Sequence, residues 1–244
     1  KGACFGEVAG WERTNWFAPA GKKAEYEYTY GRQNWFEYTA AECKATREAV
    51  AMFDQSSFGK FVLEGADAEQ IINNVSANDM SVPVGKLVYT QWLNERGGIE
   101  ADLTVTREAA DRYLVVTAAA TQVRDFQWLK NHIPADARAT LTDVTSGSAV
   151  LSIMGPNSRA LLQSLTSTDM SNEAFPFGTS QIIDLGYARV RASRVTFVGE
   201  LGWELYIATE YATGVFDAIV AVGDKFGLKH AGYHALNSMR TEKG

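Results

Sequence analysis

Two segments of the sequence carry carboxylates at positions where they could do chemistry. In the first segment, Gly97 and Gly98 precede an alternating run over residues 99–107. The glycine pair supplies the positive φ that a tight hairpin needs, and alternation then places Glu100 and Asp102 on the polar face of a strand. An ionised carboxylate there could stabilise a cationic carbon and shuttle a proton. The same pattern is typical of an ordinary solvated sheet face, which periodicity alone favours.

The apolar residues of this strand fall on its other face, and they are Ile99, Ala101, Leu103 and Val105.

The second segment, residues 197–206, places two glutamates around a turn. Gly199 and Gly202 form the turn between two strands. Glu200 and Glu204 are an even number of residues apart and could therefore lie on one side.

Aromatic residues surround this pair of glutamates, namely Phe197, Trp203 and Tyr206. A carboxylate flanked by aromatic rings could receive a flat heterocycle such as a pterin. A pterin offers a ring N–H and an exocyclic amine side by side, and a carboxylate accepts both as it accepts a guanidinium. The rings would sandwich the heterocycle. The alternative interpretation is an acidic hairpin tip that binds no ligand.

The elements that must position these carboxylates indicate an α+β fold. Residues 39–42 read as a capping box that opens a helix over about 39–53, because Ala and Met are strong helix formers. Further helices are predicted over 66–75, 121–132, from Pro156 onward, and 211–226. Strands are predicted over 60–64, 87–93, 99–106, 113–117, within 139–154, and over 190–197 and 203–208. Short turns between strands indicate antiparallel sheets.

Composition excludes several classes of function. The chain has 244 residues, 46% of them apolar, and a net charge of -6. The negative charge argues against a nucleic-acid interface. The chain contains no run of about 18 apolar residues, so we expect no membrane span. Cys4 and Cys43 form no C-x-x-C pattern, which fits a reducing compartment without a disulfide scaffold. Small molecules or proteins are the expected partners.

Motifs for nucleotide and metal chemistry are absent from the sequence. There is no G-x-G-x-x-G, no G-x-x-x-x-G-K-[ST] and no H-E-x-x-H. The chain therefore carries no dinucleotide, P-loop or zinc-protease signature. His230 and His234 are four apart and could share a helix face, but no third ligand accompanies them. We expect two ordinary histidines and no metal.

The first 38 residues contain ten aromatic side chains and little regular period. Their number is too high for a solvated linker. We expect a strap that lies over another surface of the protein.

Both carboxylate segments resemble motifs of the glycine-cleavage T-protein (aminomethyltransferase) family. In that family, G-G-x-x-x-D-L and an aromatic-x-G-E-x-G-x-E run flank the tetrahydrofolate pocket, and here they correspond to residues 97–103 and 197–204. Residues 154–158 and 237–244 look like two further landmarks of the family, in the expected order. Residues 10–17 are similar to the segment before the folate lobe in dimethylglycine and sarcosine dehydrogenases.

The resemblance covers essentially the whole chain and implies two interleaved antiparallel-sheet lobes with flanking helices. The implied parts are an N-terminal strap over 1–45, an inner lobe over 61–143, and an outer lobe formed by 46–60 with 144–244. The folate pocket would lie between the lobes. The resemblance also implies an FAD domain before Lys1 and a small β-barrel domain after Gly244.

The implied function is that of a tetrahydrofolate-binding one-carbon acceptor. A flavin domain would oxidise a small methylated amine to an iminium, and the folate would carry the carbon away as methylenetetrahydrofolate. Asp102 matches the catalytic aspartate, and Glu204 matches the pterin-clamping glutamate, with Glu200 as a weaker candidate. The other expected folate contacts are Phe197, Trp203, Tyr206 and Leu103. The implied location is the bacterial cytoplasm or the mitochondrial matrix.

Two positions depart from the family pattern. Phe197 stands where the family commonly has Tyr, which removes a hydroxyl and retains a ring. Leu236 stands where T-proteins have Arg, which favours the dehydrogenase branch over aminomethyl transfer from a lipoyl carrier. Two alternatives remain: a demethylase that takes its methyl group from a different donor, such as a sulfonium or methoxy compound, and a non-catalytic regulatory relative.

Overall fold

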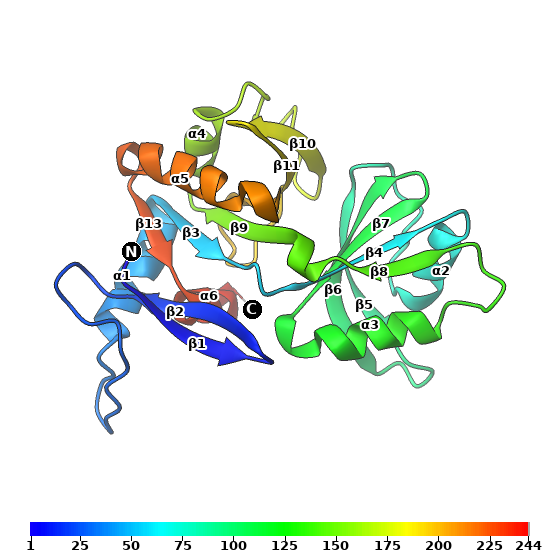
Figure 1. Ribbon diagram of the computed structural model, residues 1–244, viewed down its shortest axis with the longest axis horizontal. Helices are drawn as coiled ribbons and strands as arrows, with labels where there is room; N and C mark the ends of the chain where they lie inside the picture. Colours follow the sequence, from blue (N-terminus) through cyan, green and yellow to red (C-terminus); the bar gives the residue numbers. More distant parts are fainter. Residues whose placement is uncertain (244) are drawn as a thin grey trace.

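A computed structural model of the protein describes residues 1–243, so Gly244, the last residue of the landmark at 237–244, lies outside the described residues. These residues form a two-stranded, a six-stranded and a five-stranded sheet. Figure 1 shows the two larger sheets side by side, with helices against their outer surfaces and the two-stranded sheet below the six-stranded one. The expected α+β class with antiparallel sheets and flanking helices is confirmed.

The six-stranded sheet has the order β10 (Ser180–Leu185), β11 (Ala188–Ser193), β12 (Gly202–Ala208), β9 (Ser148–Met154), β3 (Val50–Asp54) and β13 (Leu228–Ala231). All neighbours are antiparallel except β13 and β3. The antiparallel five-stranded sheet has the order β5 (Leu87–Leu93), β6 (Ile99–Ala109), β7 (Arg112–Thr117), β4 (Gly59–Glu64) and β8 (Thr140–Asp143). The helices are α1 (Phe36–Glu48), α2 (Ala68–Val75), α3 (Gln122–Asn131), α4 (Ser158–Gln163), α5 (Ala212–Gly223) and α6 (Tyr233–Lys243).

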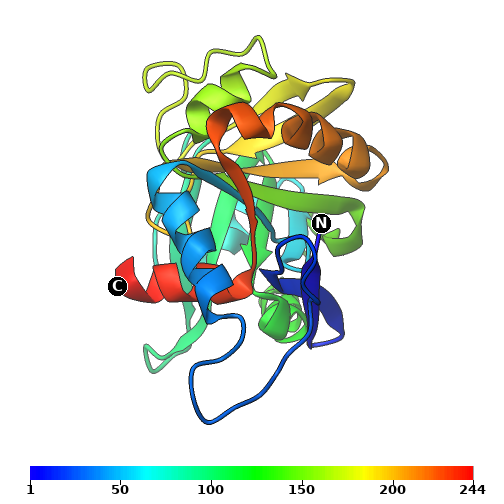
Figure 2. The ribbon, with the colours of Figure 1, turned by 90° about the vertical axis from the view of Figure 1, so that its left-hand side faces the viewer.

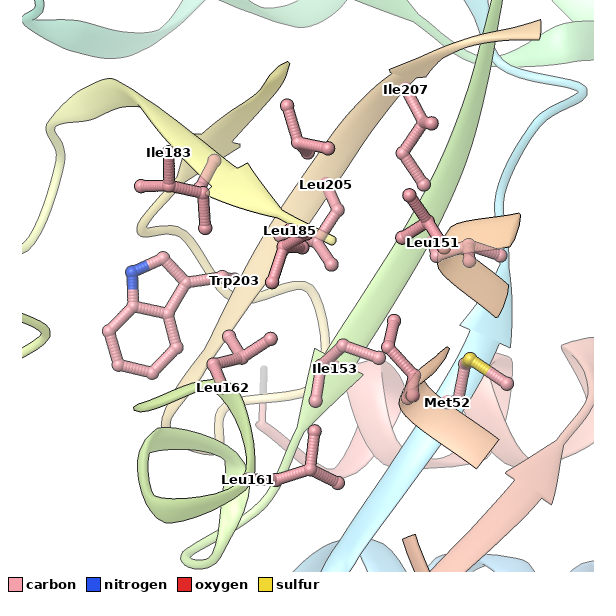
Figure 3. Packing of buried hydrophobic residues seen from close by; sticks show 14 of the residues in the cluster. Met52, Leu151, Ile153, Leu161, Leu162, Ile183, Leu185, Trp203, Leu205 and Ile207 are labelled. Atoms are coloured by element: carbon pink, nitrogen blue, oxygen red, sulfur yellow. The ribbon is translucent and has the colours of Figure 1, made fainter. Parts of the chain in front are cut away.

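Each large sheet buries a hydrophobic core against its own helices. Side chains of β9, β10 and β12 pack with α4 and α5 in the first core. Figure 3 shows those of the strands and of α4. Side chains of β4, β6 and β7 pack with α2 and α3 in the second. The chain leaves the six-stranded sheet after β3, builds the whole five-stranded sheet, and returns at β9. We propose that these two sheets are the outer and inner lobes.

The predicted capping box at residues 39–42 is wrong. Helix α1 begins at Phe36, and the backbone N–H of Thr39 already donates to the carbonyl of Trp35 at 2.9 Å. The carboxylate of Glu42 turns away from the helix end and accepts the backbone N–H groups of Phe17 and Gly232 at 2.8 and 3.0 Å. Pairing of Glu42 with distant backbone therefore replaces the local pattern.

The predicted continuation of this helix to Phe53 is also wrong, because Val50–Asp54 is a strand. Four of its five residues are at most 2% exposed, since the strand lies inside the sheet and is covered on both faces. A strand buried on both faces shows no alternation, and a short apolar run with Ala and Met then resembles a buried helix. The short strands β10 and β13 were not predicted.

The N-terminal strap is more regular than expected. β1 (Ala3–Val8) and β2 (Trp11–Phe17) form an antiparallel hairpin. Trp16 of β2 is fully buried and stacks on Tyr38 of α1, with ring centroids 5.5 Å apart. Figure 2 shows the hairpin and α1 on the same side of the molecule as α6.

Glu42 gives the strap a testable pH dependence. Burial raises the pKa of this carboxyl to about 7, against the lowering effect of its two backbone N–H donors. A carboxyl with a raised folded-state pKa contributes stability below its unfolded pKa, and this contribution is lost as pH rises through the folded pKa.

We therefore expect the unfolding free energy of the wild type, relative to Glu42→Gln, to fall by on the order of 3 kcal/mol from about pH 4 to about pH 8. Urea denaturation across this pH range measures it. Glu48→Gln on the exposed surface of the same helix should change nothing. A difference that is independent of pH would contradict the buried, titrating carboxyl.

Candidate functional site

The two carboxylates expected to act, Asp102 and Glu204, lie on the faces that the two large sheets turn toward each other. Along β12, Trp203, Leu205 and Ile207 enter the core together with residues of α4 and α5. Figure 3 shows these three side chains on one side of the strand. Strand alternation directs Glu204 and Tyr206 to the opposite face. There Tyr206 packs with Val150 of β9 against Val62, Leu114 and Val116 of the five-stranded sheet.

Asp102 belongs to the facing surface of the five-stranded sheet. Its neighbour by alternation, Thr104, is paired with Val116, which packs against Tyr206. Thr104 and Asp102 are two residues apart and therefore share this face. Asp102 is exposed, whereas Glu204 is only 6% exposed. One carboxylate is therefore open to solvent and the other is enclosed.

The Glu204 carboxylate accepts one side-chain hydrogen bond and can accept more. The Tyr206 hydroxyl donates to its Oε2 at 2.7 Å, and burial raises the pKa of the carboxyl. Ser152 of β9 pairs with Glu204 in the sheet, and its hydroxyl donates to Oε1 of Gln55. The Nε2 of Gln55 is buried and has no acceptor among the described residues. Ser152 therefore links an acceptor, the Glu204 carboxylate, with an unpaired donor, the Gln55 amide, and a polar heterocyclic ligand requires groups of both kinds.

Tyr89 accompanies Asp102 on the five-stranded sheet. Asp102 pairs with Gln91 of β5, and Tyr89 lies two residues along the same strand on the same face. Hydrogen bonding to Asp102, together with burial, raises the pKa of the Tyr89 phenol. Glu100 shares the face too, but its carboxylate accepts the Asn94 amide at 2.7 Å. Asp102 therefore combines exposure with a phenol that can share a proton.

Two of the expected folate contacts are corrected because their side chains lie on the wrong face. Trp203 is fully buried beside Phe175, with ring centroids 5.9 Å apart, on the core side of β12. Leu103 is 3% exposed and packs in the core of the five-stranded sheet. Strand parity separates each of them from the carboxylate next to it. Both side chains therefore lie on the face opposite to Glu204 and Asp102.

Glu200 and Phe197 lie in the loop before β12, outside the strand. The spacing argument that placed Glu200 beside Glu204 fails because alternation begins only at Gly202. Glu200 instead lies 3.8 Å from Arg47 of α1. Phe197 makes an edge contact with Phe58 at 5.9 Å and has the Arg240 guanidinium 5.6 Å above its ring.

Ile99 also departs from the expected pattern: it is 67% exposed, because it lies at the end of β6 beyond the core.

The sequence pattern does not identify Gln55, because this residue follows a strand that the pattern predicts as a helix. Tyr89 could have been predicted from the sequence. It shares a face with Gln91 in a strand whose predicted bounds, 87–93, are correct.

The two histidines do not share a helix. His230 is on β13 between the rings of Phe17 and Phe216, at 5.3 and 5.5 Å, and burial lowers its pKa to about 4. His234 is on α6, and its Nε2 lies 3.0 Å from the Tyr26 hydroxyl. Across residues 1–243 no three His, Cys, Asp or Glu residues are grouped to hold a metal.

Two cavities lie elsewhere on the molecule. One of about 710 Å³ separates α1 from α6 and includes Cys43, and one of about 480 Å³ lies under the hairpin beside His230. Neither is lined by Asp102 or Glu204.

None of the helices described is long and apolar enough to cross a membrane.

Comparison with known proteins gives consistent relationships. The family described as the GCVT N-terminal domain matches residues 1–244. The chain is 45% identical over 243 residues to 4-methylaminobutanoate oxidase (formaldehyde-forming) of Paenarthrobacter nicotinovorans, and 38% identical over 282 aligned residues to human mitochondrial sarcosine dehydrogenase. All of this chain is covered in both cases, but only 29% and 31% of the relatives.

A solved structure has the same fold. The glycine cleavage system aminomethyltransferase T from Bartonella henselae superposes with a TM-score of 0.79 at 24% identity. The match covers 99% of this chain and 59% of that one.

Proposed function

Because the chain belongs to the family of the GCVT N-terminal domain, we propose that it binds tetrahydrofolate between its two large sheets and delivers a one-carbon unit to it. In this proposal the chain is the acceptor module of an FAD-dependent N-methyl amine dehydrogenase. The observation that carries the proposal is the placement of Asp102 and Glu204 on facing sheet surfaces. The relatives at 45% and 38% identity, an oxidase and a dehydrogenase of methylated amines by name, support it.

The residues around Glu204 fit a reduced pterin ring. The Glu204 carboxylate has one donor, Tyr206, and can accept the paired N–H groups of the heterocycle. The buried amide of Gln55 has no acceptor and could donate to a ring oxygen or nitrogen. Tyr206 presents its ring beside the carboxylate. Glu204, Gln55 and Tyr206 are therefore the residues that would hold the pterin.

Asp102 would act on the proton and the charge. When bound, tetrahydrofolate supplies a ring nitrogen that accepts the carbon, and the product leaves as methylenetetrahydrofolate. An ionised carboxylate near the carbon stabilises a cationic donor and can take up or return a proton, an effect of about 10²- to 10⁴-fold. Hydrogen bonding to Asp102 raises the pKa of the Tyr89 phenol. The phenol therefore stays protonated and can hold the carboxylate in place.

Oxidation of the amine would take place in a flavin domain that this chain does not supply. No dinucleotide-binding glycine motif occurs in the sequence. The proposed partners are thus folate, a small methylated amine and an FAD domain. The proposed location is the bacterial cytoplasm or the mitochondrial matrix, the latter because one relative is mitochondrial by name.

A product assay on the full-length protein tests this function. Tetrahydrofolate and a methylated amine should together yield methylenetetrahydrofolate, and the amine alone should yield free formaldehyde. Product formation only with a sulfonium or methoxy donor would point to the demethylase alternative. Folate binding without turnover would point to a regulatory relative, and no binding of tetrahydrofolate at all would reject the proposal.

A further inference from the structure

The N-terminal hairpin reaches from one large sheet to the other. Strand β2 contacts α1, α6 and β13, which belong to the region of the six-stranded sheet. At its tip, the Trp11 indole N–H donates to the Gln122 side chain at 3.2 Å, at the start of α3 beside the five-stranded sheet. Figures 1 and 2 both show the hairpin tip next to α3. Residues of β2 therefore lie where the two lobes meet.

Arg13 of this strand is a cation without an acidic partner. Its guanidinium lies 4.1 Å from the centroid of the Tyr233 ring. Its Nε is buried and has no acceptor, and no carboxylate within residues 1–243 lies within 4.0 Å of it. Stacking on an aromatic face leaves the edge of a guanidinium, with its N–H donors, available to a ligand. A half-buried cation with an unpaired donor is suited to an anion.

Tyr233 connects Arg13 with the candidate folate site. Its hydroxyl lies 3.2 Å from Ser57 Oγ, and burial raises its pKa. The charge of Arg13 opposes this rise, and the charge of Glu204 adds to it. Ser57 follows Gln55 by two residues, so the Tyr233 hydroxyl joins Arg13 to the segment that carries the unpaired Gln55 amide.

We propose that Arg13 binds a carboxylate of a ligand at this site, with its planar guanidinium as the donor. This inference rests on the proposed function. Two carboxylates could reach Arg13: that of the glutamyl tail of the folate, and that of an N-methyl amino acid. In either case the strap completes the site, because the guanidinium comes from β2 and the pterin-binding residues come from the sheets.

The test compares ligands with and without a carboxylate in the full-length protein. Arg13→Gln removes the charge and retains a planar group. Its affinity is measured by titration for tetrahydrofolate and for 6-methyltetrahydropterin, which has no carboxylate. With sarcosine and 4-methylaminobutanoate, the share of the carbon that reaches saturating tetrahydrofolate is measured, because the amines themselves are oxidised in the flavin domain. Arg32→Gln is the control, because Arg32 lies on the same strap with an exposed side chain that pairs with Glu37. The thermal unfolding midpoint checks that both variants are folded.

Loss of a charge-assisted hydrogen bond should weaken the carboxylate ligand by about 10-fold or more. Weaker tetrahydrofolate binding with unchanged 6-methyltetrahydropterin binding identifies the folate tail as the source. A smaller share of methylenetetrahydrofolate and more free formaldehyde from either amino acid, with the affinity for both pterins unchanged, identifies the amine donor. Unchanged affinity for both pterins together with unchanged transfer, or an equal loss of affinity for both pterins, overturns the proposal. Failure of the wild type to bind tetrahydrofolate would instead reject the proposed function.

Discussion

Asp102→Asn in the full-length protein is expected to lower carbon transfer to tetrahydrofolate by about 10²-fold or more, because an amide can neither take up a proton nor balance a cationic carbon. Reduction of the flavin by the amine should stay nearly unchanged, since that chemistry belongs to another domain. Free formaldehyde should appear in place of methylenetetrahydrofolate. Stopped-flow absorbance of the flavin and a product assay measure the two steps separately.

Glu100→Gln is the matched control for this experiment. Glu100 lies two residues away on the same face of β6, and its carboxylate is already held by the Asn94 amide. It should change transfer little. Equal losses at both positions, or a normal yield of methylenetetrahydrofolate from Asp102→Asn, would make Asp102 an ordinary carboxylate on a solvated sheet face.

Strand parity made part of this site predictable. The alternation of β6 places Asp102 on the polar face, and the structure has it exposed there. The same rule applied to β12 separates Trp203 from Glu204, because they are adjacent in the strand. Closeness in sequence suggests that Trp203 contacts a ligand of Glu204, but parity places its side chain on the core face of β12, where the structure has it.

Other parts of the site depend on long-range pairing that no local pattern contains. Glu204 meets Gln55 only through Ser152, because β12 pairs with β9 and β9 pairs with β3. Gln55 and Ser152 are 97 positions apart in the chain, and Glu204 lies a further 52 positions on. Likewise, Arg13 meets Tyr233 only after the hairpin folds back on α6. Periodicity identifies a strand and its faces, but it does not identify the neighbouring strand.

The misread strand β3 has a specific physical cause. A strand in the middle of a sheet with side chains packed on both faces loses the alternation that marks a half-buried strand. Residues 50–53 are all apolar and almost fully buried. They directly follow a genuine helix, so helix propensity extended the prediction past Glu48, where the helix ends. Gln55, the residue with the unpaired amide, was lost with the strand that precedes it.

Glu204→Gln is expected to weaken the binding of tetrahydrofolate by about 1.5 to 3 kcal/mol, or about 10- to 150-fold, which is the range for a charge-assisted hydrogen bond. The substitution keeps the shape of the side chain and leaves an oxygen to accept the Tyr206 hydroxyl. It also removes a carboxyl whose ionisation burial disfavours, so the unfolding midpoint should stay the same or rise. Weaker binding would then report a lost ligand contact and not a damaged fold.

Glu200→Gln is the control, since Glu200 lies in the preceding loop near Arg47, and it should bind folate normally. The pH dependence adds a second, independent readout. Because the pKa of Glu204 is raised, the ionised acceptor becomes populated only as pH rises through that raised value, and wild-type affinity should increase over the same interval. Glu204→Gln should lose this increase. Unchanged affinity in Glu204→Gln, together with a loss in Glu200→Gln, would place the pterin clamp in the loop and not on β12.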